Sequence, residues 1–250
     1  MNRLHRQLDN RVRFDWGLQG AEALGAADIA VVVDVLSFTT TVTVAADAGI
    51  TVYPYRWNDD GAVRFAADHD AVLARRRSEC RPGQISLSPG SIRSTATPGR
   101  LVLPSPNGST IAHHLAGAAN VCVGVSLRNA SAAATWIAEN HDPAITTVAV
   151  VAAGERWPDG SLRPSVEDLW GAGAALSHLI EHGWIDLSPE ARTAVASWRE
   201  CAGAPLSALT ECASGRELIG VGYGQDVTIA AEVDRSTSVP ILRGNCFVTL

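Results

Sequence analysis

An unbroken apolar run, Ile29–Val33, constrains the fold of this chain more than any other stretch. Its residues are mostly β-branched and do not alternate with polar ones, which is typical of a strand buried on both faces. Asp34 follows at once, then the hydroxyl-rich stretch Ser37–Thr41. Val42–Ala48 has helical spacing, with Gly49 as a C-terminal stop. The sequence therefore predicts a strand, a polar turn and a helix, with one carboxylate where the strand ends.

The chemistry of this junction favours a metal and an anion. Ligands bind at the carboxyl ends of strands in open α/β sheets, and a helix N-terminus attracts phosphate. Asp34 beside an anion is repulsive unless a cation lies between them, so the sequence predicts a divalent ion, with Mg²⁺ the natural partner of carboxylates and phosphates. The simpler reading is that Asp34 caps the helix, although Ser37 is the better-placed cap.

The same layout recurs twice along the chain. Leu101–Leu103 leads through Asn107–Thr110 into a helix, and Thr146–Val151 leads through a long loop into a helix over 166–182. Alternating strands and helices predict a layered α/β/α fold with a mostly parallel or mixed sheet. We expect a single compact α/β domain over 1–250, with two lobes, roughly 1–100 and 101–250, as the alternative.

If the three strands are parallel neighbours, their loops converge on one edge of the sheet. Asp34, the stretch Asn107–Thr110, and Glu155 with Glu167 and Asp168 then face one cleft. Each has a simpler reading, because Asn-Gly is a turn signal and Ser165-x-x-Asp168 fits a capping pattern. Together they suit phosphate-ester hydrolysis, in which a carboxylate-held Mg²⁺ and helix N–H groups neutralise charge.

Periodicity disappears between Arg75 and Arg100, where prolines, glycines and serines accumulate. A loop of this length inside a compact domain is commonly functional. The run Arg75–Arg77 is the only basic cluster, and it is typical of a solvated turn or of a counter-charge to an anionic substrate.

Composition excludes several classes of protein. The 250 residues carry a net charge of −6 with dispersed acids, so we expect no nucleic-acid partner. The N-terminus lacks a secretory signal, and no run approaches the roughly 18 apolar residues of a membrane helix. Five scattered cysteines without Cys-x-x-Cys spacing indicate reduced thiols in a cytoplasmic protein.

Other phosphatase classes fit the residues poorly. Asp34-Val35-Leu36 lacks the second Asp of an Asp-x-Asp site. Cys122 and Arg128 have Cys-x5-Arg spacing, but an apolar strand keeps such a thiol inert. His113 and His114 are minor candidates near the Asn107 turn. No Gly-x-Gly-x-x-Gly or Walker sequence indicates a nucleotide.

Four stretches, in the same order, resemble the 2-phosphosulfolactate phosphatase family: VVVDVLSFTTTVTVAADAG, LVLPSPNGSTIAHHLAGAANVCVGVSLRNASA, AAGERWPDGSLRPSVEDLWGAGAALSHL and GYGQDVTIAAEVDRSTSVPIL. The resemblance runs from about Ile29 to Leu242. It implies a Mg²⁺-dependent phosphatase of the kind that serves coenzyme M biosynthesis.

Carried over by position, the resemblance implies roles for further residues. Asp34 matches the Asp of the family's Asp-Val-Leu-Arg-Ala-Thr-Thr motif, and Asn107, Gly108 and Ser109 match its Asn-Gly-Thr turn. Glu167 and Asp168 match its Leu-Glu-Asp motif, Asp226 matches an Asp of its Gly-Phe-x-x-Asp segment, and Ser88 with Pro89 matches the end of its Gly-Asn-Ser-Pro loop. The last match puts the aperiodic segment at the active site.

The chain departs from the family on the substrate side. Ser37 stands where the family has Arg, Leu87 where it has Asn, and Arg75–Arg77 where it has Gly-Glu-Arg. A missing Arg removes a bidentate anion clamp that other donors do not replace. Any one of four arginines could compensate: Arg76, Arg77, Arg128 or Arg156.

The leading hypothesis is a Mg²⁺-dependent phosphatase that acts on a small acidic phosphoester, 2-phosphosulfolactate or an analogue, and forms a homodimer. We assign Asp34, Glu167 and Asp168 to catalysis, the same three with Asp226 to the metal, and Ser88 with Asn107, Gly108, Ser109 and Thr110 to the substrate. The alternatives are an anion-binding protein without turnover, and a metal-dependent phosphonate or sulfonate lyase.

Overall fold

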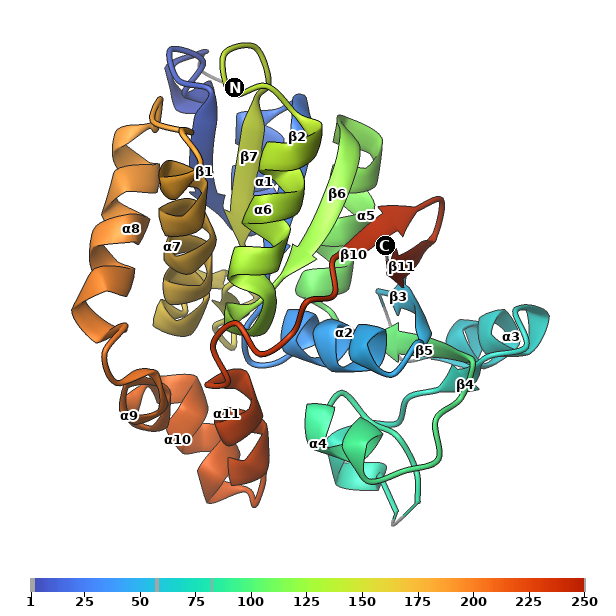
Figure 1. Ribbon diagram of the computed structural model, residues 1–250. Helices are drawn as coiled ribbons and strands as arrows, with labels where there is room; N and C mark the ends of the chain where they lie inside the picture. The colour runs from blue at the N-terminus through green and yellow to red at the C-terminus, as the bar shows by residue number, and fades with distance from the viewer. Residues whose placement is uncertain (1–2, 57–58, 82, 250) are drawn as a thin grey trace.

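The computed structural model describes residues 3–56, 59–81 and 83–249. A mixed nine-stranded sheet runs through it in the order β1-β7-β2-β6-β10-β11-β3-β5-β4, with helices on both faces (Figure 1). The predicted α/β class and layered architecture are therefore confirmed.

Four parallel strands form one half of the sheet. They are β1 (Val12–Trp16), β7 (Val148–Ala152), β2 (Ala27–Val33) and β6 (Ala119–Val125). Val33 pairs with Ala152 on one side and with Val125 on the other, so these three strands end level with one another. The loops after β2 and β7 therefore meet, as the sequence predicts.

The other half of the sheet runs the opposite way. It contains β3 (Thr51–Tyr55), β5 (Arg100–Pro104) and β4 (Val72–Leu73), which are parallel to one another. The hairpin of β10 (Pro240–Arg243) and β11 (Cys246–Thr249) joins the halves. The pairs β6–β10, β10–β11 and β11–β3 are all antiparallel, and together they reverse the strand direction between the two halves. The expectation that β5 is a parallel neighbour of β2 is therefore wrong.

The central strand β2 is buried on both faces, as predicted. Ile29, Val31 and Val33 pack into the apolar core that α6 (Ala130–Asn140), α7 (Val166–Glu181) and α8 (Pro189–Cys201) cover. Ala30 and Val32 pack into a second core on the other face, with side chains from α2 (Phe38–Asp47) and α5 (Gly108–Ala118). Period-two alternation along a strand places these two sets on opposite faces.

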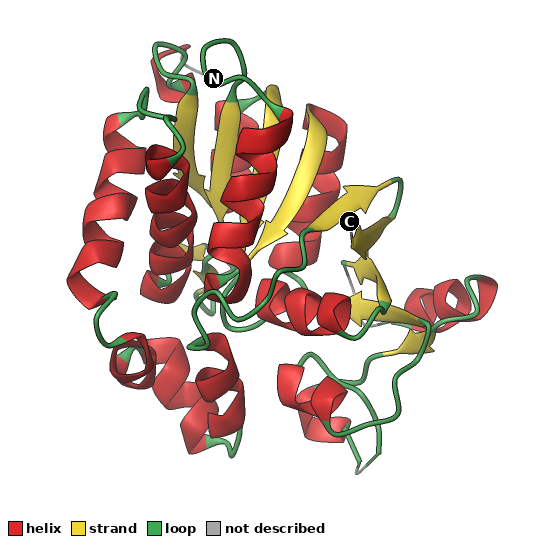
Figure 2. Ribbon diagram, viewed as in Figure 1, coloured by secondary structure: helices red, strands yellow, loops and turns green. Residues whose placement is uncertain are grey.

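Small helices gather below the carboxyl ends of the parallel strands β1, β7, β2 and β6 (Figure 2). The remaining helices are α1 (Gly17–Leu24), α3 (Asp60–Asp68), α4 (Pro89–Arg93), α9 (Pro205–Glu211), α10 (Ala213–Gly220) and α11 (Gly224–Ala230); 3-10 turns cover Arg3–Arg6, Arg77–Glu79 and Leu127–Asn129. A short hairpin, β8 (Glu155–Arg156) with β9 (Leu162–Arg163), was not predicted. Among its described residues, the aperiodic segment forms a 3-10 turn and α4, which packs against α2 and α11.

Two further observations concern the helices. Asp59 caps α3 by accepting a hydrogen bond from Ala62 N–H. Of the helices in the described ranges, none has both the length and the apolar character needed to cross a bilayer.

Candidate active site

Asp34 joins the beginnings of two helices. It lies at the end of β2 with 7% of its surface exposed. Its Oδ1 accepts a hydrogen bond from the backbone N–H of Phe38, at the start of α2, over 3.0 Å. Its Oδ2 accepts one from the backbone N–H of Gly108, at the start of α5, over 3.1 Å. One buried carboxylate therefore satisfies free N–H groups of two helix N-termini.

Ser37 does not cap α2, contrary to the expectation from its position. Its side chain accepts no hydrogen bond from the first turn, because Asp34 already binds the N–H of Phe38. The Ser37 hydroxyl instead accepts a hydrogen bond from the guanidinium of Arg77 over 2.7 Å. The Leu36–Ser37 peptide bond in this turn is cis. Asp34 is thus the cap of the helix as well as the first member of an acidic cluster.

Asp168 ties α7 to the loops after β2 and β7. Its Oδ1 accepts a hydrogen bond from the N–H of Val35 over 2.7 Å, and its Oδ2 accepts one from Gly154 over 2.8 Å. The side chain of Ser165 makes no capping bond to α7, so the capping-box reading is wrong. Val35 is the residue after Asp34, so Asp34 and Asp168 lie close together, as the sequence predicts.

Four carboxylates influence one another at this edge of the sheet. Burial, with a smaller contribution from the charge of Glu167, raises the pKa of Asp34 to about 6 against the hydrogen bonds and the Arg77 charge that lower it. Burial and the charges of Asp34 and Glu167 raise the pKa of Glu155 to about 7 and that of Asp168 well above its usual range. Burial and mutual repulsion therefore disfavour the fully ionised cluster.

The carboxylates of this site suit Mg²⁺ by their charge, but they do not surround a single ion on all sides. Within residues 3–56, 59–81 and 83–249, no three His, Cys, Asp or Glu side chains are grouped so that they could share one ion. Mg²⁺ commonly binds one or two protein carboxylates and takes its other ligands from water and substrate phosphate. A cation at this edge would relieve the repulsion that raises the carboxyl pKa values.

The turn predicted to hold phosphate is largely engaged with protein groups. The N–H of Gly108 binds Asp34, and the hydroxyl of Ser109 donates to the Leu103 carbonyl over 3.3 Å. Asn107 donates to Glu155 over 2.9 Å through Nδ2 and accepts from Arg156 over 3.0 Å through Oδ1.

Thr110 is different from its neighbours in the turn. Its buried hydroxyl has no hydrogen-bond partner among the described residues. It lines a cavity of about 70 Å³ together with Asn107, Glu155 and Arg156. Since a buried hydroxyl normally has a partner, Thr110 is the member of this turn best suited to receive a ligand oxygen.

Asp226 and Ser88 form a separate group around Arg77. Ser88 donates its hydroxyl proton to Oδ1 of Asp226, and the guanidinium of Arg77 pairs with Oδ2 over 3.0 Å. Tyr223 donates its hydroxyl proton to the Arg77 carbonyl over 2.7 Å. The structure therefore brings Asp34, Glu167 and Asp168 together and gives Asp226 a cationic partner. The assignment of Asp226 as a metal ligand stays a prediction.

Arg77 is the site residue that the sequence only half revealed. The sequence offers it as one of four arginines that could replace the missing clamp, and its signals are the aperiodic segment and the basic run Arg75–Arg77. Its charge lowers the pKa of Asp34 against the effect of burial. Of the others, Arg156 reaches Asn107, whereas Arg128 forms ion pairs with Asp47 and Glu232.

Two other candidates lie outside the cluster. Burial raises the pKa of Cys122 to about 12, so its thiol is inert, as predicted. The ring of His113 contacts the carbonyl of Pro54 over 2.9 Å and so belongs to the β3 side of the sheet.

Comparison with known proteins agrees with this geometry. The family model described as 2-phosphosulpholactate phosphatase matches residues 19–245. A protein of Thermus thermophilus named probable 2-phosphosulfolactate phosphatase is 34% identical over 89% of this chain and 91% of its own. Proteins with that name from Deinococcus radiodurans and Carboxydothermus hydrogenoformans are 30% and 28% identical over 86% of this chain, and over 88% and 87% of their own. The chain therefore belongs to the 2-phosphosulpholactate phosphatase family.

Proposed function

We propose that this chain is a Mg²⁺-dependent phosphatase that hydrolyses 2-phosphosulfolactate, or a close analogue, to sulfolactate and inorganic phosphate. Family membership and the names of the relatives support a phosphoester substrate. The observation that carries the proposal is the group of Asp34, Glu155, Glu167 and Asp168, in which burial and neighbouring acids disfavour full ionisation, so that a bound cation would favour it. We further propose that the protein is cytoplasmic and forms a homodimer. Light scattering on the purified protein tests the dimer.

The carboxylates divide into two roles. Asp34 and Glu167 hold the ion in this proposal, and Asp168 orients the first turn of α7, on which Glu167 lies. Bound Mg²⁺ would neutralise phosphate charge and orient the attacking oxygen. Arg77, fixed by Asp226, stands beside this group as a cationic donor for a phosphate or carboxylate oxygen.

Glu155 is suited to move a proton. Burial is the main cause that raises its pKa, to about 7 before any ion binds, and burial favours the protonated form that a general acid needs. Asn107 donates to its Oε2, which leaves Oε1 as the atom that carries the proton. We propose that Glu155 protonates the leaving oxygen of sulfolactate. In Glu155→Gln we expect kcat to fall by about 100-fold or more, because general acid catalysis contributes that much.

Phosphate release from 2-phosphosulfolactate, with Mg²⁺ or with a chelator, tests the main proposal. We expect release only with Mg²⁺, and its near-abolition in Glu167→Gln. The matched control is Glu139→Gln, an exposed carboxylate on α6, which should behave as the wild type. Calorimetric titration with Mg²⁺ measures whether Glu167→Gln has lost the ion as well. Equal release with and without the chelator would refute the dependence on Mg²⁺.

Chemical trapping during a single turnover separates two routes to the same products. Direct attack of water on phosphorus leaves Asp34 unmodified throughout. Attack by Asp34 expels the leaving oxygen and forms an aspartyl phosphate, whose P–O bond water then breaks. Borohydride reduces this acyl phosphate to homoserine, which mass spectrometry of the Asp34 peptide detects. The route belongs to the chemistry of the site and leaves the substrate assignment unchanged.

The departures from the family's motifs favour anion binding without turnover as the second candidate. Ser37 and Leu87 stand where the resemblance implies Arg and Asn, while Arg77 remains beside the cluster as a cationic partner for an anion. Tight binding of sulfolactate, measured by calorimetry, with no phosphate released from any ester would support it. Turnover of 2-phosphosulfolactate would exclude it.

A further inference from the structure

A cavity of about 400 Å³ lies beside the active site, lined on one side by the segment Ala74–Arg77 and on the other by Pro104–Pro106. Small-molecule sites in proteins are commonly about 300–1,000 Å³. Every charged residue that lines it, among those described, is an arginine, and Leu87 adds an apolar surface. A cavity with this lining suits an anion carried on a short carbon skeleton.

Two connections place this cavity next to the acidic cluster. The wall Pro104–Pro106 leads directly into Asn107 and the start of α5, where Gly108 binds Asp34. Arg77 lines the cavity and at the same time pairs with Asp226 and donates to Ser37, the residue that precedes α2. A substrate whose phosphate lies at the acidic cluster can therefore extend its other half into the cavity.

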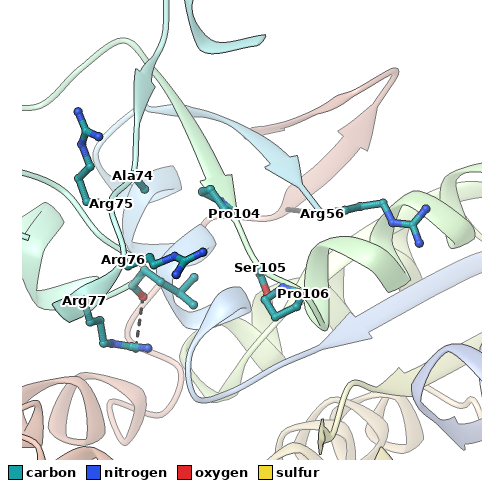
Figure 3. Close-up of a pocket in the computed structure, with 9 residues that line it drawn as sticks. Arg56, Ala74, Arg75, Arg76, Arg77, Pro104, Ser105 and Pro106 are labelled. Carbon is teal, nitrogen blue, oxygen red and sulfur yellow. Dashed lines mark hydrogen bonds between the residues drawn. The ribbon is translucent and has the colours of Figure 1, made fainter. Parts of the chain in front are cut away.

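The arginines point in different directions, as Figure 3 shows. The side chain of Arg76 extends from its segment towards Ser105, across the cavity. The side chains of Arg75 and Arg56 point away from it. Arg77 turns to the side, where it is held by Asp226. Arg76 is thus the guanidinium best placed to meet a ligand in the cavity.

We propose that Arg76 is a specificity-determining residue that binds the second anionic group, carboxylate or sulfonate, of the phosphoester. The proposal rests on the proposed function, because the phosphate is taken to lie at the acidic cluster. Guanidinium pairs with both of these groups through two parallel hydrogen bonds, which gives direction as well as charge. The apolar wall of Leu87 and Pro104 contacts the carbon skeleton between the two anionic groups.

Four esters and three variants test this role. The esters are 2-phosphosulfolactate, 2-phospholactate with the carboxylate only, 2-phosphoethanesulfonate with the sulfonate only, and ethyl phosphate with neither. The variants are Arg76→Ala, Arg76→Lys and, as a matched control outside the cavity, Arg64→Ala, an exposed arginine on α3. Steady-state kinetics give kcat and KM for each pair, and calorimetric titration with sulfolactate gives binding without turnover.

In Arg76→Ala we expect KM to rise about 10- to 100-fold for the ester that carries the group bound by Arg76, with kcat little changed. The rate on ethyl phosphate should be unchanged, Arg76→Lys should lie between, and Arg64→Ala should match the wild type. Sulfolactate should bind Arg76→Ala more weakly by a similar factor. Whichever single-anion ester is affected identifies the group.

Other results would overturn the proposal. An equal loss on all four esters would place Arg76 at the phosphate, and no loss on any would remove it from the substrate. If the wild type releases phosphate from none of the esters, the proposed function fails by itself. Binding of sulfolactate by wild type and Arg76→Ala then decides the role of Arg76, since equal affinities would refute it.

Discussion

Gly108 shows how closely single residues are fitted at this site. A Cβ atom added there would lie 2.3 Å from Phe38 Cδ1 and 2.6 Å from Asp34 Oδ2. Both neighbours are buried, and both belong to the junction of β2 with α2. The Asn-Gly pair is readable from sequence as a turn, but the reason for glycine is a contact with a residue 74 positions away.

Gly108→Ala should therefore weaken folding and disturb the site together. We expect a loss of about 1–3 kcal/mol in the free energy of unfolding, the usual effect of overpacking a core, and the loss of most activity. Gly117→Ala is the control in the same helix. Nothing lies within 4 Å of a Cβ there, so helix propensity should make it neutral or slightly stabilising. Urea unfolding of the two variants measures the difference, and equal stability would contradict the steric argument.

Helix α7 connects the site to the far side of the molecule. Its first turn holds Glu167 and Asp168, and its last turn holds His178, whose ring contacts Glu181 over 2.9 Å and Asp234 over 3.1 Å. Sequence predicted this helix over 166–182, almost as found, because apolar spacing and Gly183 mark it locally. The partner Asp234 is 56 residues away and could not be inferred from any local pattern.

The ion pairs of His178 predict how stability depends on pH. Asp234 is the main cause that raises the pKa of His178 to about 9, and Glu181 adds to it. The unfolded chain binds this proton less tightly than the folded protein does, so the contribution to stability is complete below about pH 6.5, the usual pKa of histidine. It is lost as the pH rises from there to about 9.

Denaturant unfolding between pH 6 and pH 9.5 measures this contribution. We expect the free energy of unfolding of the wild type to fall more steeply across that range than that of Asp234→Asn. The two curves should converge at the alkaline end, where His178 is neutral in both. Parallel curves would mean that the pair does not stabilise the folded protein.

At the scale of the whole molecule, the sequence predicted the parts better than their assembly. The strand before Asp34 and the helix over 166–182 lie within a few residues of their expected places, because burial on both faces and helical spacing are local properties. The hairpin β10–β11 lies in the middle of the sheet and reverses β3, β5 and β4. Only long-range pairing fixes that place.

The meeting of the acidic residues was nevertheless predicted. Two different structural features bring the residues of the site together. Asp34 and Asp168 meet because β2 and β7 are parallel neighbours. Gly108 reaches them although β5 belongs to the reversed half, because its N–H at the start of α5 binds Asp34 beside β2. Arg77 and Asp226 are 149 positions apart, so their pairing could be learned only from the structure.

Binding of Mg²⁺ should be visible as a property of the whole fold. The cluster draws on the loop after β2, the loop after β7 and the first turn of α7, so an ion there would oppose the separation of all three. A ligand that binds only the folded state stabilises it by about 2.7 kcal/mol at 100 times its Kd. We expect Tm to rise with Mg²⁺ in the wild type and Glu139→Gln, and much less in Glu167→Gln. NaCl of matched ionic strength controls for screening. A rise of the same size with NaCl, or in Glu167→Gln, would show that the ion is not held by this cluster.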